Sequence, residues 1–408
     1  MEEENKIRLA FIEETSSLGG AQLNNIDLQK SIDRSHFEVI VICPTEGPLT
    51  EALKRLGVSV EIVRMPSLMS TSSRIGRIQI FNPFAVFIDI FIVFLMAFKL
   101  GGVFRRFKIH AVMTNGMFAH LYGGLASKIS DVGCLWHFDD IVKPNLFFGW
   151  VIRFLRQMAK IIPYKIIVPS KAVKDAMFPG DEFIEKVKVI YNTADLEIFN
   201  VNRVAPRLRD EFSISAENIV VGIFSRLAAW KGHREFLQAA ASLRKRNPNV
   251  KFMVVGGAIF EDRGYEQELR KLVSRLGIQN DVIFTGFRKD VPECIASMDL
   301  CVLPSILPDP SPRVLFEAMA MEKALIATKL GGAPEIIEDN KTGLLVPAGD
   351  IHKLSEAITF FVDHPEIRKQ MGEAGRLRLQ HLFNRERFVY EHVCLFEEAG
   401  GFTHRQLK

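Results

Sequence analysis

The stretch NIVVGIFSRLAAWKG (218–232) contains the pattern that decides the fold. It opens with a continuous apolar run that ends at Ser225, and a helical pattern begins shortly afterwards, at Arg234. A short apolar run bounded by polar residues is typical of a strand that is buried on both faces. A strand followed directly by a helix is the repeating unit of sheets with parallel strands.

Similar units extend from this stretch in both directions along the chain. The predicted strands alternate with helical patterns and cover residues 7–12, 39–43, 58–63, 110–114, 133–136, 164–168, 187–190, 218–227, 250–255, 282–285, 300–303, 325–327 and 343–346. This alternation predicts the α/β class, with two successive doubly wound halves, each a parallel sheet covered by helices on both faces.

The two halves predict two main domains. Asn, Asp, Pro and Arg residues interrupt the alternation over 195–215. We therefore expect an N-terminal domain over 1–200 and a C-terminal domain over 201–384, as a length of 408 residues allows. The last helical stretch, within 385–408, is expected to pack back on the N-terminal domain.

The charge balance argues against a nucleic-acid partner. The net charge is +4, from 52 basic and 48 acidic residues, whereas nucleic-acid binders are usually far more basic. The charge is uneven, however, because residues 64–174 hold 15 Lys and Arg but only 4 Asp and Glu. The same stretch contains 13 of the 32 phenylalanines. This concentration predicts a basic, aromatic surface in the N-terminal half and a partner that fits it.

Cysteine usage and the N-terminus indicate a reducing compartment. The five cysteines are an odd set without a C-x-x-C pair, which argues against a disulfide framework or a zinc site. The chain begins with Met1 and three glutamates rather than with a secretory signal. We expect a cytoplasmic protein.

One segment departs from the alternation. Over 84–98 five phenylalanines recur at helical spacing, and Asp89 is the one charged residue. Fifteen residues are fewer than the ~20 needed to cross a bilayer, and the central Asp opposes insertion. Three interpretations stay open: a buried or docking helix, an interfacial membrane helix, and a true span. The basic flanks favour the interfacial helix over a purely buried one; they are Arg74, Arg77, Arg105, Arg106 and Lys108.

The motif SRLAAWKG (225–232) places two cations on a loop after a strand. Open α/β sheets bind their ligands at the carboxyl ends of strands. Arg226 and Lys231 would suit a diphosphate there, the Arg as a planar fork and the Lys as a point charge. The alternative is a solvated loop with two surface cations.

The motif DPSPRVLFEAMA (309–320) contains two carboxylates eight residues apart, Asp309 and Glu317. A helix is predicted after the prolines, and its start would offer free N–H groups at Val314 and Leu315, a ready anion site. Glu317, one turn inside the helix, would face hydroxyl groups. The alternatives are a capping or surface role for Glu317 and plain turn chemistry for Asp309.

Two weaker candidates remain. In ATKLGGAPEII (327–337) the Gly pair allows a close backbone approach and Glu335 opens a helix, which is typical of a tight turn. His137 ends the predicted strand CLWH (134–137), close to Asp139 and Asp140. This histidine is either structural or functional.

The order of these motifs resembles a family. The sequence is similar to the retaining glycosyltransferases of family 4, which have the GT-B fold, most strongly over 218–350. The matching elements are GGA (19–21), SRLAAWKG, TGFRKDVPECIASMDLCVLPS (285–305), the carboxylate-x7-carboxylate element with EAMA (317–320), and GGAPEII. The resemblance implies two Rossmann-like domains that face each other across a cleft.

The resemblance also implies a role for each matching residue. Arg226 and Lys231 would stabilise the leaving diphosphate of a nucleotide-sugar, and Glu317 would hold the ribose hydroxyls. The N–H groups of Val314 and Leu315 would meet the phosphates.

Further implied contacts concern the two substrates. Asp309 and the backbone of Pro310, Ser311 and Pro312 would contact the donor sugar. Gly19 and Gly20 would lie under the donor phosphates, and His137 would sit beside the acceptor. The family usually has Glu at the position of Asp309 and a Gly-Phe-Gly-like stretch in place of Pro-Ser-Pro, which weakens any assignment of the donor sugar.

The implied reaction is a retaining transfer of a sugar to an acceptor hydroxyl, without a cofactor or a metal, since no D-x-D pair lies at the relevant strand ends. We expect a lipid-linked or membrane-proximal glycan acceptor, as in polysaccharide or glycoconjugate biosynthesis. An anionic membrane would be met through residues 74–108 and 143–165, peripherally on the inner face of the cell membrane.

Several other functions compete with this interpretation. A glycosidase would have no use for the basic pair, a dehydrogenase would need G-x-G-x-x-G after a strand, and a P-loop NTPase would need a Walker A motif. Neither motif is present. The alternatives left open are a sugar-nucleotide epimerase or a phosphorylase of the same fold, and a non-catalytic sugar-nucleotide-binding partner.

Overall fold

The computed structural model describes residues 6–65, 72–75, 78–81, 83–141, 149–180, 183–244, 246–257 and 264–401. They form two compact units. Unit 1 contains the chain up to Pro169, Val173–Ile190 and the chain from Phe388 onward. Unit 2 contains Ser170–Ala172 and Tyr191–Arg387. The C-terminal end of the chain is therefore part of the first unit.

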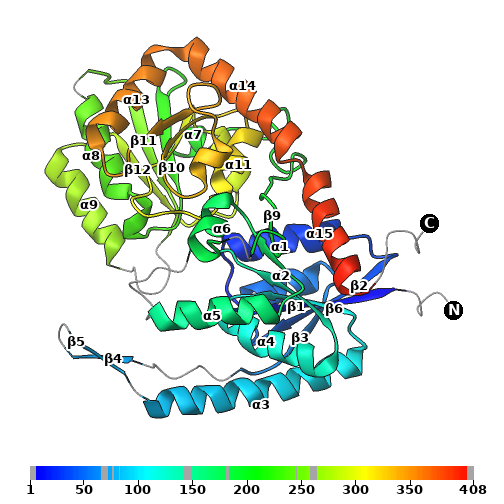
Figure 1. Ribbon diagram of the computed structural model, residues 1–408. Helices are drawn as coiled ribbons and strands as arrows, with labels where there is room; N and C mark the ends of the chain where they lie inside the picture. The colour runs from blue at the N-terminus through cyan, green and yellow to red at the C-terminus, as the bar shows by residue number, and fades with distance from the viewer. Residues whose placement is uncertain are drawn as a thin grey trace. The chain divides into compact units, whose positions relative to one another are not determined.

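Unit 1 is built on a seven-stranded sheet in which every strand pair is parallel, in the order β3-β2-β1-β6-β7-β8-β9 (Figure 1). The strands are β1 (Ile7–Glu13), β2 (Phe37–Cys43), β3 (Ser59–Ile62), β6 (Ala111–Asn115), β7 (Gly133–His137), β8 (Lys165–Val168) and β9 (Val187–Val189). An antiparallel hairpin, β4 (Ser72–Ile75) with β5 (Ile78–Phe81), stands apart from this sheet.

Alternating side chains of the central strand enter two different apolar cores, because successive residues of a strand point to opposite faces. Leu9 and Phe11 belong to one core and Ala10 and Ile12 to the other. The helices around this sheet are α1 (Gly20–Ser31), α2 (Pro48–Arg55), α3 (Pro83–Phe107), α4 (Met117–Ser130), α5 (Gly149–Ile161), α6 (Lys171–Met177) and α15 (Arg385–Ala399).

Unit 2 repeats the design with six parallel strands in the order β12-β11-β10-β13-β14-β15. They are β10 (Ile219–Phe224), β11 (Val250–Val255), β12 (Val282–Gly286), β13 (Leu300–Leu303), β14 (Ala324–Thr328) and β15 (Leu344–Val346). A 3-10 turn (Ala229–Lys231) and eight helices accompany them in the described part of this unit: α7 (Arg207–Glu211), α8 (His233–Arg244), α9 (Tyr265–Leu276), α10 (Val291–Ala296), α11 (Arg313–Ala320), α12 (Ala333–Ile336), α13 (Ile351–Asp363) and α14 (Pro365–Leu382).

The predicted fold class is confirmed. Every predicted strand is present, with its ends shifted by at most three residues. In each sheet, the strand that comes first in the chain lies inside the sheet. The next strands follow on one side of it and the later strands on its other side. This change of side lies between β1 and β6 in unit 1 and between β10 and β13 in unit 2. Ligands of doubly wound sheets bind outside the carboxyl ends of strands at this switch point.

Helix α3 differs from its prediction. It runs from Pro83 to Phe107, 25 residues, whereas the apolar segment was expected to end at 98. The expectation of a length too short to span a membrane was therefore wrong, and Phe87–Phe107 is long and apolar enough to do so by length and composition. One side of α3 nevertheless belongs to a core of unit 1 through Met96, Ala97, Leu100 and Phe104.

Candidate functional site

An ion pair joins two loops at the switch point of unit 2. The Nζ of Lys231, on the loop after β10, donates to Oδ2 of Asp309, on the loop after β13. Both side chains are largely buried, with 13% and 10% of their surface exposed. Gly232 makes the close approach of these loops feasible, because a Cβ there would lie 1.9 Å from the carbonyl oxygen of Pro304. The structure thus brings together two residues that the sequence offered in separate motifs.

Trp230 organises the two predicted cations. The ammonium of Lys231 lies 4.2 Å from the centroid of the indole ring, and the guanidinium of Arg226 lies 5.6 Å from it. A cation over an aromatic face is attracted by the ring, which here holds both positive charges near one place. Arg226 itself is exposed at the end of β10. Trp230 was not among the predicted residues, although it stands between them in the motif.

The second predicted carboxylate has a basic partner on its own helix. Nε of Arg313 donates to Oε1 of Glu317 at 2.6 Å, one turn apart at the start of α11, and both side chains are mostly buried. Arg313 was missed, although the spacing of four residues was visible in the sequence. The N–H of Leu315 donates to the carbonyl of Pro312 at 3.0 Å. It is not the free group that was expected, so a phosphate at Leu315 would have to share or replace this bond.

The loop 309–312 is fixed by contacts from three directions. The N–H of Gly332 donates to the carbonyl of Asp309 at 2.8 Å, and Ser170 Oγ donates to the carbonyl of Pro310 at 2.7 Å. Asn192 Nδ2 donates to Ser311 Oγ at 3.1 Å. The GGAPEI turn is therefore a support of this loop.

Glu335 has an anchoring role in unit 2. Its carboxylate accepts hydrogen bonds from the N–H groups of Lys171 and Ala172 and from the hydroxyl of Tyr191, each at 2.8 Å. Burial and the bond to Glu335 raise the pKa of Tyr191, which stays a donor. The carboxylate thus ties Ser170–Ala172, and with it the contact of Ser170 to Pro310, to unit 2.

A row of three polar side chains lies at the switch point of unit 1. Glu13, Asn115 and His137 end β1, β6 and β7, and the strand register places them side by side. Asn115 Nδ2 donates to Glu13 Oε1 at 3.0 Å, and Asn115 Oδ1 lies 3.0 Å from Nδ1 of His137. Asn25 Nδ2, from α1, donates to the same oxygen of Glu13 at 2.9 Å. Glu13 and Asn115 were missed, although each is a polar residue that ends an apolar strand.

Burial favours the neutral forms of this row. It raises the pKa of Glu13 to about 8 and lowers the pKa of His137 to about 4. Burial, followed by the charge of Asp140, raises the pKa of Asp139 to about 8, and Asp139 Oδ2 lies 3.3 Å from Nδ1 of His137. A strand-end histidine that is neutral at pH 7 can accept or donate a hydrogen bond to a substrate hydroxyl.

The predicted Gly pair lies at the start of α1. Gly19 precedes the first residue of the helix, Gly20, and both are exposed. A Cβ on Gly20 would meet no atom within 4 Å among the residues that the structure describes. The backbone at this helix start is accessible to a ligand of unit 1.

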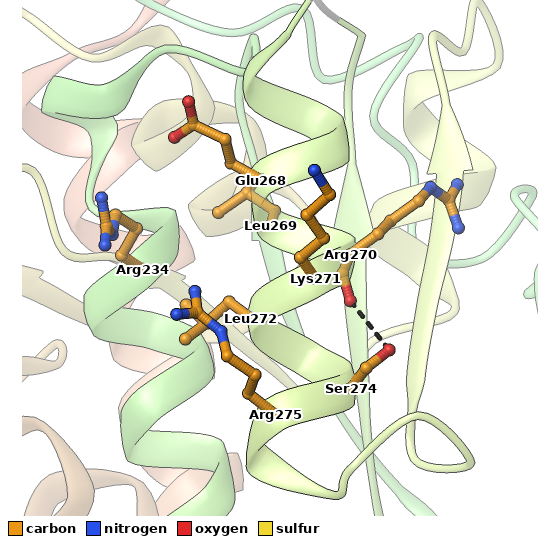
Figure 2. A pocket seen from close by; sticks show the side chains of 8 residues that line it. All are labelled: Arg234, Glu268, Leu269, Arg270, Lys271, Leu272, Ser274 and Arg275. Atoms are coloured by element: carbon orange, nitrogen blue, oxygen red, sulfur yellow. Dashed lines mark hydrogen bonds between the residues drawn. The ribbon is translucent and has the colours of Figure 1, made fainter.

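A hollow elsewhere in unit 2 contains none of the predicted site residues. It has a volume of about 680 Å³ and lies between α8 and α9, with Arg234, Lys271 and Arg275 among its lining side chains (Figure 2). Its two helices pack on one face of the sheet, and α8 begins at His233, directly after the loop that carries Lys231. Within the described ranges, no group of three or more His, Cys, Asp or Glu residues that could hold a metal ion is found.

Two protein-family models match the chain in succession. Glycosyltransferase Family 4 matches residues 18–198, and Glycosyl transferases group 1 matches residues 204–378. The chain belongs to these GT-B glycosyltransferases. The fold of this glycosyltransferase is similar to that of HepE from Anabaena, solved in complex with UDP, with a TM-score of 0.82 and 26% identity over 96% of this chain and 100% of HepE. HepE has also been solved with UDP-glucose, with a TM-score of 0.81.

Most of the curated relatives carry the name of a glycosyltransferase, although several match only in part. The alpha-D-kanosaminyltransferase of Streptomyces kanamyceticus is 32% identical over 41% of this chain and 42% of its own length. The spore coat protein SA of Bacillus subtilis is matched over 59% of its length, so this chain aligns with less than two thirds of either relative. An alpha-1,3-galactosyltransferase of Escherichia coli, named for UDP-Gal and a GlcNAc-diphosphoundecaprenol, is 22% identical over 93% of this chain and 94% of its own length.

Proposed function

We propose that this glycosyltransferase moves a sugar from a nucleotide-sugar, with UDP as the nucleotide, to a hydroxyl of a lipid-linked or membrane-proximal glycan. The observation that carries the proposal is the pair of cations, Arg226 and Lys231, held beside Trp230 at the switch point of unit 2. The complexes of HepE with UDP and UDP-glucose support a UDP-sugar donor. The name of the Escherichia coli relative supports both this donor and a lipid-linked acceptor.

The chemistry follows from charge. When the bond between the anomeric carbon and the diphosphate breaks, negative charge grows on the leaving phosphate. Arg226 and Lys231 stabilise that charge, together with the N–H of Val314 at the start of α11. Positive side chains supply what a metal ion would otherwise supply, so we expect activity to persist in EDTA. Asp309 holds the ammonium of Lys231 in place and contacts the donor sugar.

Glu317 is proposed to bind the ribose hydroxyls. Its side chain is 8% exposed, and Arg313 stabilises the charge of its carboxylate from one side at 2.6 Å. An ionised carboxylate accepts hydrogen bonds from a vicinal diol more strongly than a neutral acceptor does. The acceptor hydroxyl then attacks from the same face of the sugar that the diphosphate leaves, which retains the anomeric configuration.

The acceptor side of the proposal rests on α3. Four phenylalanines on its outer side expose large fractions of their surface: Phe87 74%, Phe91 64%, Phe94 49% and Phe98 59%. The opposite side packs into unit 1, so we propose that α3 lies in the membrane surface rather than across it. Arg105 and Arg106 at its end provide attraction to anionic lipid.

Helix α5 also carries exposed apolar and basic side chains. Phe154 and Ile161 are 47% and 65% exposed, and Arg153 and Lys160 lie on the same helix. Residues 143–148 of the predicted membrane-binding stretch 143–165 lie outside the described residues. A peripheral enzyme on the cytoplasmic face of the membrane would reach a lipid-linked acceptor from this position.

A panel of nucleotide-sugars tests which nucleotide the donor carries. Thermal unfolding is followed with UDP-glucose, UDP-galactose, UDP-N-acetylglucosamine, GDP-mannose and ADP-glucose. A donor at a hundredfold excess over its Kd stabilises the protein by about 2.7 kcal/mol. We expect stabilisation by a UDP-sugar; stabilisation by GDP-mannose or ADP-glucose alone would contradict the nucleotide assignment. Interconversion of free UDP-glucose and UDP-galactose would point to the epimerase instead.

A further inference from the structure

The hydrogen bonds of the polar row at the switch point of unit 1 have a fixed order of donors and acceptors. Glu13, Asn115 and His137 are linked by hydrogen bonds across three neighbouring strand ends. We propose that Glu13 is a positioning residue which, through the amide of Asn115, fixes the ring nitrogen that His137 offers to a substrate hydroxyl. The substrate part of this inference rests on the glycosyl transfer proposed above, whereas the tautomer part does not.

The chain of hydrogen bonds begins at one oxygen of Glu13. Oε1 accepts from two side-chain amides, Asn25 Nδ2 at 2.9 Å and Asn115 Nδ2 at 3.0 Å. An oxygen that faces two N–H donors is an acceptor, whether the carboxyl group is ionised or neutral. A proton on this group would lie on Oε2, which is buried and faces neither of these two amides. The bond to Asn115 therefore holds in both protonation states of Glu13.

The acceptor at Glu13 determines the orientation of the Asn115 amide. Because Nδ2 of Asn115 is turned toward Glu13, Oδ1 is turned toward His137, 3.0 Å from Nδ1. An amide oxygen can only accept, so Nδ1 of His137 must carry the hydrogen. Nε2 then keeps its lone pair and acts as an acceptor. Glu13 thus selects one tautomer of a histidine two strands away.

The neighbours of His137 are compatible with this tautomer. Asp139 Oδ2, at 3.3 Å from Nδ1, is a second acceptor for the same hydrogen when the carboxyl proton of Asp139 lies on Oδ1. The ring of His392, from α15, lies edge-on to the ring of His137, with 6.0 Å between the ring centroids. Nδ1 of His392 donates to the carbonyl oxygen of Phe388. His120 is bound to Thr114 Oγ1 at 2.7 Å. Burial lowers the pKa of His137 to about 4, so the ring stays neutral around pH 7.

A fixed acceptor nitrogen selects how a sugar hydroxyl binds. A hydroxyl donates its hydrogen to Nε2 of His137, and its oxygen lone pairs remain free for another partner or for attack. In the other tautomer Nε2 would carry a hydrogen, and the hydroxyl would have to present a lone pair. Asn25 also connects Glu13 to the Gly19-Gly20 turn. Helix α1 starts at this turn, and its residue Asn25 donates to the carboxylate of Glu13.

The tautomer is measured directly by ¹⁵N NMR of the full-length protein with labelled histidine. The signals of His137 are assigned by their loss in His137→Gln, and the variants compared are Glu13→Met, Glu13→Gln and Glu14→Gln. Gln at position 13 keeps an acceptor oxygen for both amides, whereas Met keeps the length of the side chain without an acceptor. Glu14, which accepts from the N–H of Phe118 at 3.2 Å and lies outside the row, is the matched control.

We expect the wild type, Glu13→Gln and Glu14→Gln to carry the hydrogen on Nδ1 of His137, and Glu13→Met to show a mixture of tautomers. Transfer should fall about tenfold to a hundredfold in kcat/KM for Glu13→Met and recover largely in Glu13→Gln. A wild-type ring with its hydrogen on Nε2 would overturn the proposal without any variant, even if Glu13→Met fails to fold. An unchanged tautomer in a folded Glu13→Met would do so as well. If the tautomers behave as expected but no sugar is transferred, the proposed function fails and the positioning of His137 stands.

Discussion

Lys231 and Asp309 form an ion pair that connects the loop after β10 to the loop after β13 in unit 2. The pair lies at the switch point, where the strand order of the doubly wound sheet changes side. It therefore joins the loops after the two strands that flank the expected ligand position. Its carboxylate restrains a long, flexible ammonium, which can then meet a phosphate without first losing much conformational freedom. We propose that the ion pair prepares the site that receives the leaving phosphate.

Removing Lys231 tests this preparation. Lys231→Ala leaves the largely buried carboxylate of Asp309 without its partner, and we expect a loss of about 1–3 kcal/mol in the free energy of unfolding. We also expect kcat to fall by roughly 10²–10³, the usual effect of losing one group that stabilises transition-state charge. Urea unfolding and steady-state transfer measure the two effects.

A matched control lies at the opposite edge of the same sheet. Lys251, near the start of β11, pairs with Asp281 at 2.9 Å, and Asp281 keeps a second partner in Arg244. Lys251→Ala should lower stability by no more than Lys231→Ala does and leave kcat unchanged. Equal losses of kcat in both variants would show that the effect is one of general destabilisation.

Glu317→Gln tests the ribose contact. The change removes the charge but keeps an acceptor, so we expect the Kd of UDP to rise about tenfold. Calorimetric titration with UDP and with 2′,3′-dideoxy-UDP separates the contact from indirect effects. The wild type should discriminate between the two ligands, and the variant should not. If Glu317→Gln still discriminated fully between UDP and 2′,3′-dideoxy-UDP, Glu317 would not be the residue that binds the ribose hydroxyls.

The pH dependence of stability tests the buried carboxyl group of Glu13. Burial raises its pKa from 4.5 to about 8, so the native state binds the proton more tightly than the unfolded chain. The resulting stabilisation is fully present below pH ~4.5 and is lost as the pH rises through about 8. Between pH 5 and 8, the unfolding free energy of the wild type should therefore fall relative to Glu13→Gln, by at most about 1.4 kcal/mol per pH unit. Urea unfolding of both proteins at each pH gives this difference; a difference that rises with pH would contradict the assigned direction.

The exposed side of α3 predicts lipid binding. Full burial of one Phe side chain contributes about 1.5–3 kcal/mol. Replacing Phe91, Phe94 and Phe98 together by Ser should therefore weaken binding to phosphatidylglycerol-containing vesicles at least a hundredfold. Phe287→Ser is the control, since this residue is 70% exposed but belongs to unit 2. Vesicle sedimentation at low salt measures binding, and wild-type protein that stays in solution would contradict the membrane surface.

Glu335 predicts a graded loss of stability. Glu335→Ala removes the acceptor of three hydrogen bonds, and Tyr191→Phe removes one of the three donors. We expect the first change to cost about 1–3 kcal/mol of unfolding free energy and the second about 1 kcal/mol. Thermal and urea unfolding measure both values. Equal effects would mean that the bonds to Lys171 and Ala172 contribute nothing.

The strands could be predicted because each is a short, mainly apolar run bounded by polar or turn-forming residues. An example is β11 (Val250–Val255), which lies between Asn249 and Gly256 and whose bounds match the prediction. The loop cations could also be predicted, since the sequence alone shows where a strand ends and which residues follow it. The carboxylate partner of Lys231 could not, because it depends on which strands are neighbours: β10 lies beside β13, and this order becomes visible only when the sheet is folded.

The same reason explains the omission of Glu13 and Asn115. Each is an ordinary polar residue in its own segment, and only the register of β1, β6 and β7 places them beside His137. The length of α3 was missed for a different reason. Basic residues after 98 suggested an end, but Arg106 lies along the helix and pairs with Glu61 at 2.6 Å.

We propose that the chain uses a nucleotide-sugar and transfers its sugar with retention. The most direct measurement is ¹H NMR of UDP-glucose, UDP-galactose and UDP-N-acetylglucosamine incubated with the wild type and with Lys231→Ala. In the absence of an acceptor, we expect slow release of UDP and of a free sugar from one of these donors, with the α-anomer appearing first and with much slower release in Lys231→Ala. No UDP from any donor with a folded enzyme, or a β-anomer as the first product, would contradict it.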